Sequence, residues 1–185
     1  MKNLKILVGV TGGIAAYKTC DLVRTLIKDE CEVRVVMTRS ATEFVTPLTF
    51  EVLSRNPVPL GLFDRRNDPS VEHVAAAQWA DCVAIAPATA NVIGKLASGI
   101  ADDLLTTLLL AVRAGTPVVL APAMNTGMWE NPVVVRNLES LADGTDGRYS
   151  IVDPVTKELA CGDLGMGGMA PVEEIYRQIK KVTNR

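Results

Sequence analysis

The apolar run Val118–Ala121, followed by Pro122, constrains the fold of this chain more than any other stretch. A short, wholly apolar run is typical of a strand that is covered on both faces, as in a parallel sheet. Proline cannot donate a hydrogen bond to a neighbouring strand, so we expect the chain to leave the sheet at Pro122. Ligands of open α/β sheets bind at the carboxyl ends of the strands. The sequence therefore predicts a ligand site directly after this run.

The residues that follow Pro122 include one amide among apolar side chains, in the segment Ala123 to Trp129. Asn125 lies between Met124 and Thr126, and Met128 and Trp129 follow. A single polar group in apolar surroundings at a strand end is typical of ligand recognition. A turn asparagine beside core side chains is the alternative, and this segment alone does not decide between the two.

Three further stretches, at residues 5–10, 31–37 and 80–86, have strand patterns, of which the second alternates before it closes on Val35-Val36-Met37, and they are separated by stretches of helical periodicity. Later stretches with helical patterns cover residues 101–112, 131–141 and 172–182, whereas residues 143–147 are expected to form a loop. Strands that alternate with helices predict an α/β fold with a parallel sheet. A chain of 185 residues is expected to form one domain.

The first predicted strand leads into Thr11-Gly12-Gly13 and then into a helical pattern. Glycines at such a turn let backbone N–H groups approach an anion at the helix N-terminus. The spacing matches neither the dinucleotide motif GxGxxG nor the P-loop motif GxxxxGK. We therefore expect a generic phosphate cradle.

The second predicted strand ends in Thr38-Arg39-Ser40, where a dinucleotide fold usually has an acidic residue for the ribose. Two hydroxyls favour a mononucleotide, whose phosphate would accept hydrogen bonds from the glycine turn, Thr38 and Ser40. Ser40 as an ordinary helix N-cap is an equally good interpretation of that residue. Phe44 either stacks on a ligand ring or fills the core.

The third predicted strand ends in Pro87-Ala88-Thr89-Ala90-Asn91, which repeats the order proline, small residues, asparagine. Small residues around an amide suit a flat ligand that lies close to the backbone. Residues 101–112 predict a helix that is apolar around most of its circumference. Such a helix needs cover on more than one side, which a second subunit would supply.

Two reactive side chains stand outside these strand ends. His73, the only histidine, lies near the start of a short predicted helix, where a surface or packing role is the usual one. Cys161 lies in a glycine-rich segment, residues 159–168, that we expect to be a mobile loop. Neither position alone predicts chemistry.

Composition excludes several classes of protein. A net charge of −2 argues against nucleic acid as a partner. No apolar stretch is long enough to span a membrane, and the first residues lead into a strand and not into a signal peptide, so we expect a cytoplasmic protein. Four cysteines without a CxxC pair, and one histidine, give no reason to expect a metal site.

Taken together, four blocks of the sequence resemble the flavin-containing cysteine decarboxylases. They are Gly12–Lys18, His73, Pro87–Asn91 and Pro122–Trp129. The resemblance implies a Rossmann-like, flavodoxin-like three-layer domain over residues 1–185, with a mobile glycine-rich flap at about 143–170. It also implies FMN bound between the subunits of a homo-oligomer, a trimer or a dodecamer, with His73 reaching a neighbour's flavin. The implied FMN-binding residues are Gly12, Gly13, Ile14, Thr38, Ser40, Phe44, Ala88, Thr89, Ala90 and Asn91.

A fifth block, Ala160-Cys161-Gly162, is similar to family members of coenzyme A biosynthesis and is not expected in those that act on peptides. The implied reaction converts 4'-phospho-N-pantothenoylcysteine to 4'-phosphopantetheine. FMN would oxidise the substrate to a thioaldehyde, which can lose CO2, and would then reduce the resulting ene-thiol. His73 would serve as base or hydrogen-bond donor, Asn125 would hold the carboxylate, and Cys161 would supply a proton. Met124, Asn125 and Ala160 are the implied substrate-binding residues.

One departure from the family pattern is Gly168, which stands where the family motif Gly-x-Gly-Arg-Met has arginine. The glycine in place of arginine is expected to affect either closure of the flap or the contact with the substrate phosphate. In many bacteria a phosphopantothenoylcysteine synthetase domain follows on the same chain, so a fused or separate synthetase is an implied partner. A peptidyl-cysteine decarboxylase, and a non-catalytic flavin-binding regulator on the same fold, remain the alternatives.

Overall fold

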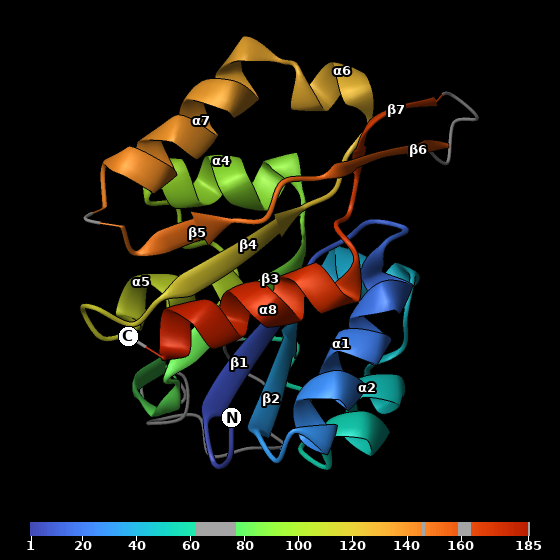
Figure 1. Ribbon diagram of the computed structural model, residues 1–185, viewed down its shortest axis with the longest axis vertical. Helices are drawn as coiled ribbons and strands as arrows, with labels where there is room; N and C mark the ends of the chain where they lie inside the picture. The colour runs from blue at the N-terminus through green and yellow to red at the C-terminus, as the bar shows by residue number, and fades with distance from the viewer. Residues whose placement is uncertain (62–76, 146, 159–163, 185) are drawn as a thin grey trace.

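A computed structural model describes residues 1–61, 77–145, 147–158 and 164–184, and a five-stranded parallel sheet lies at its centre (Figure 1). The strands are β1 (Lys5–Val10), β2 (Glu32–Met37), β3 (Cys82–Ala88), β4 (Val118–Pro122) and β5 (Tyr149–Ile151). Their order across the sheet is β2-β1-β3-β4-β5. The order changes direction at β1, so the carboxyl ends of β1 and β3 flank the topological switch point where α/β folds bind ligands.

Helices cover both faces of this sheet, which confirms the predicted three-layer α/β fold (Figure 1). One face carries α1 (Ala16–Lys28), α2 (Pro47–Ser54) and α8 (Val172–Thr183). The other face carries α4 (Ala90–Ser98), α5 (Leu104–Ala111) and α7 (Pro132–Asp143).

Alternate residues of each central strand pack into opposite layers of the core. In β1, Ile6 and Val8 belong to the cluster under α1 and α8, whereas Leu7 belongs to the cluster under α4 and α5, and all three are fully buried. A strand that is buried on both faces has no polar alternation, which is why the run is continuously apolar.

Helix α5 corrects one argument made from the sequence. Leu104, Leu105, Leu108 and Leu109 are each at most 6% exposed within the single chain, and Leu110, at 51%, is the exposed leucine of this helix. The single chain therefore covers most of the circumference of α5, and this helix gives no support for a second subunit as the source of that cover.

The predicted loop at residues 159–168 was wrong in its second half. Residues Leu164–Gly168 form β7, which pairs antiparallel with β6 (Val155–Glu158) in a small separate sheet. This hairpin projects beside the short helix α6 (Thr126–Trp129) (Figure 1). Pro122 is the last residue of β4, as predicted, and it pairs with Ala88 after a shift in register. Within the described ranges, no helix is long and apolar enough to cross a bilayer.

Candidate functional site

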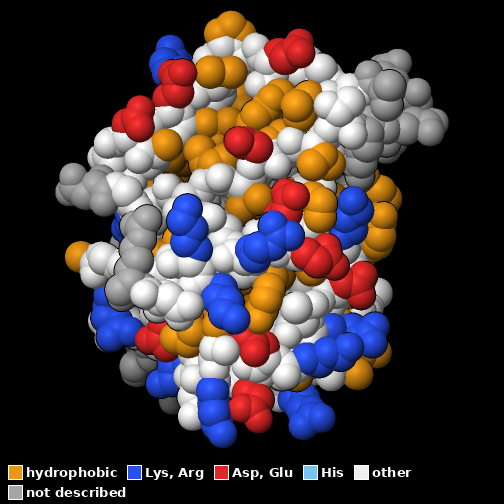
Figure 2. Space-filling view, viewed as in Figure 1, with side chains coloured by type: hydrophobic (Ala, Val, Ile, Leu, Met, Phe, Trp, Pro, Cys, Tyr) orange, Lys and Arg blue, Asp and Glu red, His pale blue; other side chains and the backbone are white. Residues whose placement is uncertain are grey.

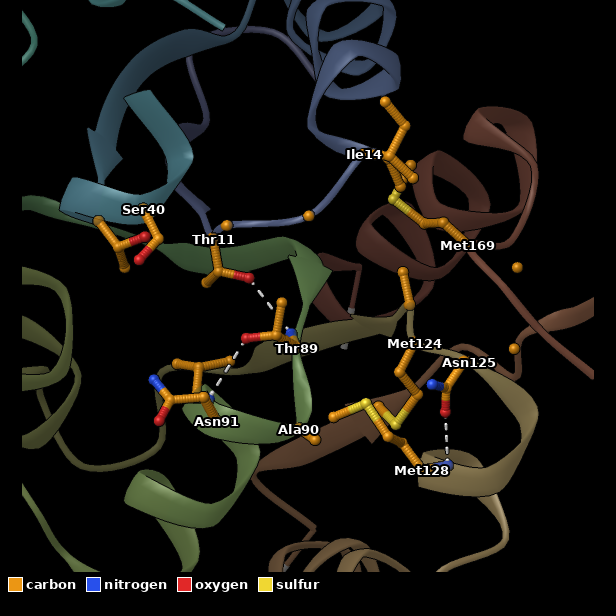
Figure 3. A pocket seen from close by; sticks show the side chains of 18 of the residues that line it. Thr11, Ile14, Ser40, Thr89, Ala90, Asn91, Met124, Asn125, Met128 and Met169 are labelled. Atoms are coloured by element: carbon orange, nitrogen blue, oxygen red, sulfur yellow. Dashed lines mark hydrogen bonds between the residues drawn. The ribbon is translucent and has the colours of Figure 1, made fainter. Parts of the chain in front are cut away.

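A pocket of about 560 Å³ opens at the carboxyl ends of β1, β3 and β4 (Figure 3). Its volume falls in the range of about 300–1,000 Å³ that is usual for small-ligand sites. Segments far apart in the sequence meet there, including the turn after β1, the turn after β3, the segment after β4 and the end of β7. The residues that line it are Thr11, Gly12, Gly13, Ile14, Ala15, Thr38, Ser40, Thr89, Ala90, Asn91, Val92, Asp103, Ala123, Met124, Asn125, Met128, Gly167, Gly168 and Met169.

Thr11 ties the first two turns of the pocket together. Its hydroxyl donates to the carbonyl of Pro87 at 2.6 Å and accepts from the backbone N–H of Thr89 at 3.2 Å. The side chain is 2% exposed, so both bonds are shielded from water. Thr11 therefore fixes the spacing between the glycine turn and the start of α4, although sequence analysis did not select it.

Gly12 lies against the segment that follows β2. A Cβ atom on Gly12 would overlap the Cβ of Ser40, so only glycine allows the two segments to approach this closely. The approach brings the backbone of the glycine turn and the Ser40 side chain to one wall of the pocket, as the sequence predicted for a phosphate cradle.

The second interpretation of Ser40, as a helix cap, does not hold. A short 3₁₀ helix, η1 (Arg39–Glu43), starts two residues earlier than this interpretation requires, and Thr38 is its N-cap, with its hydroxyl accepting from Ala41 N at 3.3 Å. The Ser40 hydroxyl makes no hydrogen bond with the described residues and lines the pocket. It is therefore available to a ligand.

The N-terminus of α4 forms another wall. Thr89 caps the helix by accepting from Val92 N at 3.5 Å, and Ala90 and Asn91, the first two helical residues, line the pocket. The N–H groups of a helix's first turn have no partner within the helix and favour an anion. Among the described residues no lysine or arginine lines the pocket, and Gly168 leaves the arginine position of the family motif without a charge. The described lining therefore offers an anion backbone N–H groups and hydroxyls.

Asn125 is oriented by its own helix. Its Oδ1 accepts from the backbone N–H of Met128 at 2.8 Å, which makes Asn125 the N-cap of α6 (Figure 3). The cap uses the side-chain oxygen and leaves the side-chain Nδ2 with both of its hydrogens to donate. Asn125 is exposed and lines the pocket, so these hydrogens can meet a carboxylate in it.

The part of the pocket beside Asn125 is rich in thioethers. Met124, Met128 and Met169 line it, and Ile14 lies near Met169 (Figure 3). Met169 is only 1% exposed, so one end of its side chain is anchored in the core. Methionine sulfur makes favourable contacts with aromatic rings and adapts to their shape. The pocket thus has a hydroxyl-and-amide part and an apolar part suited to a ring system.

Strand β7 rests directly on the segment that carries Asn125. The backbone N–H of Met124 donates to the Gly167 carbonyl at 3.0 Å. A Cβ on Gly167 would overlap the Met124 carbonyl oxygen, and Gly167 has a φ of 140° that other residues rarely adopt. A Cβ on Gly165 would likewise overlap the Thr126 side chain. The glycines of β7 are therefore explained by this close approach.

Asp103 is the charged residue of the lining, and it was not selected from the sequence. It caps α5, with Oδ1 accepting from Thr106 N at 2.8 Å, and its Oδ2 accepts from Lys95 Nζ at 3.0 Å. Burial raises its pKa, but the hydrogen bonds from Thr106 and Lys95 outweigh burial, and the pKa of Asp103 is lowered from its usual value of 3.8. Asp103 is therefore a fixed carboxylate at neutral pH.

Two predicted FMN-binding residues do not line this pocket. Ala88 is fully buried in β3, where its carbonyl accepts from Ala123 N at 3.1 Å. Phe44 is 48% exposed on the outer surface after η1 and does not fill the core. His73, Ala160 and Cys161 lie outside the described residues, and their assignments stay predictions.

Comparison with known proteins supplies an independent finding. A family model described as Flavoprotein matches residues 1–184. The chain is 48% identical over 181 residues to the coenzyme A biosynthesis bifunctional protein CoaBC of Bacillus subtilis, covering 98% of this chain and 43% of the relative. It thus spans less than half the length of that relative. It is also 41% identical over 177 residues to the probable phosphopantothenoylcysteine decarboxylase of Streptococcus mutans, covering 96% of this chain and 97% of the relative.

Two solved structures share the fold over nearly the whole chain. A mutant PPC decarboxylase complexed with pantothenoylaminoethenethiol superimposes with a TM-score of 0.86 at 33% identity and covers 100% of both chains. The FMN binding protein AtHal3 superimposes with a TM-score of 0.80 at 35% identity, covering 97% of this chain and 96% of the other.

Proposed function

The chain belongs to the flavoprotein family, and we propose that it is an FMN-dependent decarboxylase that converts 4'-phospho-N-pantothenoylcysteine to 4'-phosphopantetheine. The observation that carries the proposal is the Asn125 amide, whose donor end is free beside an apolar, thioether-lined wall. The names of the similar proteins support the same substrate, since one is a phosphopantothenoylcysteine decarboxylase and another was solved with pantothenoylaminoethenethiol.

The pocket fits FMN by the chemistry of its lining. Gly12, Gly13 and the first turn of α4 offer backbone donors, and Ser40 offers a hydroxyl, for a phosphate group. Met124, Met128 and Met169 offer an apolar wall for the isoalloxazine ring. When bound, FMN supplies an acceptor for the hydride that leaves the sulfur-bearing carbon of the substrate.

We assign Asn125 to the substrate carboxylate. An amide binds a carboxylate by hydrogen bonds without adding a positive charge. A cation would stabilise the ionised ground state and oppose loss of CO2, whereas a neutral donor orients the group at a smaller cost to the barrier.

Two further roles rest on the resemblance to the family. We propose that His73 acts as base or hydrogen-bond donor in the oxidation, because an imidazole with a pKa near 6.5 can serve both purposes at neutral pH. We propose that Cys161 delivers a proton to the ene-thiolate, because a thiol with a pKa of about 8.5 is mostly protonated at neutral pH.

We also propose that the enzyme is a homo-oligomer, a trimer or a dodecamer. The support is a set of exposed apolar side chains in the turn before α1, on α1, after η1 and on α2, and α1 and α2 pack against each other. Its members are Ile14, Tyr17, Phe44, Leu48 and Val52, which are 48–69% exposed. Groups of exposed apolar side chains are typical of interfaces. Phe44 would then meet the flavin or the pocket of a neighbouring subunit.

A phosphopantothenoylcysteine synthetase is the proposed functional partner, because the similar CoaBC proteins are bifunctional and longer than this chain. The synthetase would supply the substrate, either from the same polypeptide or from a separate one.

Incubation of the purified protein with 4'-phospho-N-pantothenoylcysteine tests the proposal. We expect a yellow protein that releases FMN on denaturation, and a product whose mass is lower by one CO2. A peptide with a C-terminal cysteine serves as the competing substrate. Turnover of the peptide alone, or an absence of turnover in protein that carries FMN, would contradict the proposed substrate or the proposed activity, respectively.

A further inference from the structure

A second cavity, of about 580 Å³, lies between α7, β5 and the end of α6, and we call it the α7–β5 groove. Trp129, Leu138 and Ile151 form its apolar floor, and Leu138 is 7% exposed. Helix α6 separates this groove from the flavin pocket, since Asn125 and Met128 line the pocket whereas Trp129 lines the groove. The proposed decarboxylation makes no use of the groove.

Acidic side chains surround this floor. Glu130, Glu139, Asp143 and Asp153 line the groove, and none of the described residues that line it is basic. All four are exposed, and none forms a salt bridge within the described part of the chain. The whole chain has a net charge of only −2, so four carboxylates around one groove are a strong local excess. Figure 2 shows hydrophobic side chains over α7 and β5 with acidic side chains around them.

One wall of the groove is the edge of the central sheet. β5 is the last strand in the order β2-β1-β3-β4-β5, and β4 is its neighbour in that sheet. A parallel strand directs half of its backbone N–H and C=O groups away from its partner, so the outer edge of β5 can accept another strand. The side chains of Ile151 and Asp153 flank that edge.

We propose that the α7–β5 groove binds an extended, basic segment of a partner polypeptide. The segment adds a strand to β5, places alternate apolar side chains on Trp129, Leu138 and Ile151, and directs its lysine or arginine side chains to the four carboxylates. Strand addition supplies affinity through backbone hydrogen bonds, and alternate side chains supply specificity. An acidic rim disfavours a second copy of the same groove, because like charges would face one another.

The probe for this proposal is a capped hexapeptide of alternating lysine and valine, titrated into the FMN-loaded full chain. Trp79→Phe removes the other tryptophan, so that the fluorescence reports Trp129 alone. We expect a saturable change in fluorescence that weakens as salt concentration rises. A matched peptide with N-methyl groups on alternate residues keeps the charge but blocks strand addition, and we expect it to bind about tenfold more weakly.

Charge specificity is tested with two pairs of substitutions. Glu139→Gln with Asp143→Asn should weaken binding about tenfold, because each loses a charge-assisted contact. Glu173→Gln with Glu174→Gln removes two exposed acidic residues from α8 and should leave binding unchanged. The proposal would be overturned if the two peptides bound equally well, or if the two pairs of substitutions had equal effects. It would also be overturned if no binding occurred at millimolar peptide, or if the protein self-associated through Trp129.

Discussion

The side-chain oxygen of Asn125 accepts a hydrogen bond from the backbone N–H of Met128 at 2.8 Å, and this bond fixes which end of the amide faces the flavin pocket. The same side chain thus begins helix α6 and presents two N–H hydrogens to a ligand. The helix cap uses only the side-chain oxygen of Asn125. It therefore pre-organises the side-chain N–H donor before any substrate binds. Asn125 is therefore a structural residue, and in the proposed function it is also the residue that recognises the substrate carboxylate.

This double role predicts the effect of Asn125→Asp. Aspartate is as good an N-cap as asparagine, so the fold and FMN content should be retained. It replaces the N–H donor with a charge that repels the substrate carboxylate, and we expect CO2 release to fall by about 10²-fold or more. Asn131→Asp is the matched control, because Asn131 lies outside the pocket lining and is likewise a helix N-cap. Its Oδ1 accepts a hydrogen bond from the backbone N–H of Val133 at 2.9 Å, at the start of α7. Similar losses in both variants would remove Asn125 from the reaction.

A second prediction concerns the glycine turn. Gly12→Ala should raise the FMN dissociation constant about tenfold, because the new Cβ overlaps Ser40 and separates two walls of the pocket. Fluorescence titration of the apoprotein with FMN measures the change. Gly61→Ala is the control, since no atom lies within 4 Å of a Cβ at that position. Unchanged FMN affinity in Gly12→Ala would show that the close approach is dispensable.

Four of the five strands of the central sheet were predictable, because runs such as residues 6–10 and Val118–Pro122 are apolar without interruption, as strands buried on both faces are. The edge strand β5 (Tyr149–Ile151) was missed, because it is only three residues long and partly buried. The strand order also places the sequence motifs at one edge of the sheet, so Gly12, Thr89 and Asn125 were found from their positions after strands.

Other features depend on tertiary contacts that periodicity cannot reveal. Asp103 was not selected from the sequence, because its pairing with Lys95 and its place in the pocket follow from how α5 packs. Strand β7 was missed because its glycines, which usually indicate a loop, serve here to approach Met124 and Thr126 closely. Short strands outside the main sheet carry little sequence signal.

The third prediction tests the proposed oligomer. Leu48→Glu with Val52→Glu places charges on α2 residues that are 65% and 69% exposed, and we expect the oligomer to dissociate to smaller species by light scattering. Leu110→Glu changes an equally apolar residue, 51% exposed on α5, and should leave the mass unchanged. A monomeric wild-type protein with full turnover would refute the oligomer as the active form.

The fourth prediction separates the two halves of the proposed reaction. Cys161→Ser should still release CO2, because Cys161 is assigned only to the later proton delivery, and a serine hydroxyl is a much weaker acid than a thiol. Mass analysis after a single anaerobic turnover should find a species two hydrogens lighter than 4'-phosphopantetheine. Normal product at the normal rate would leave Cys161 without a catalytic role.

The last prediction uses the lowered pKa of Asp103. A carboxylate whose folded pKa lies below its unfolded value of about 3.9 stabilises the fold above that value, and the contribution is lost as pH falls through the folded pKa. Asp103→Asn keeps the helix cap but removes the charge that Lys95 pairs with. The variant should therefore lose about 1 kcal/mol of unfolding free energy at pH 7, and the difference from the wild type should disappear once the pH falls below the folded pKa of Asp103. Denaturant unfolding at several pH values measures this difference.

Asp102→Asn is the control, since the Asp102 side chain is 60% exposed and its pair with Lys95 is expected to contribute about 0.5 kcal/mol or less. A difference between Asp103→Asn and wild type that stayed constant down to pH 2 would assign the loss to packing at the pocket wall and not to the charge.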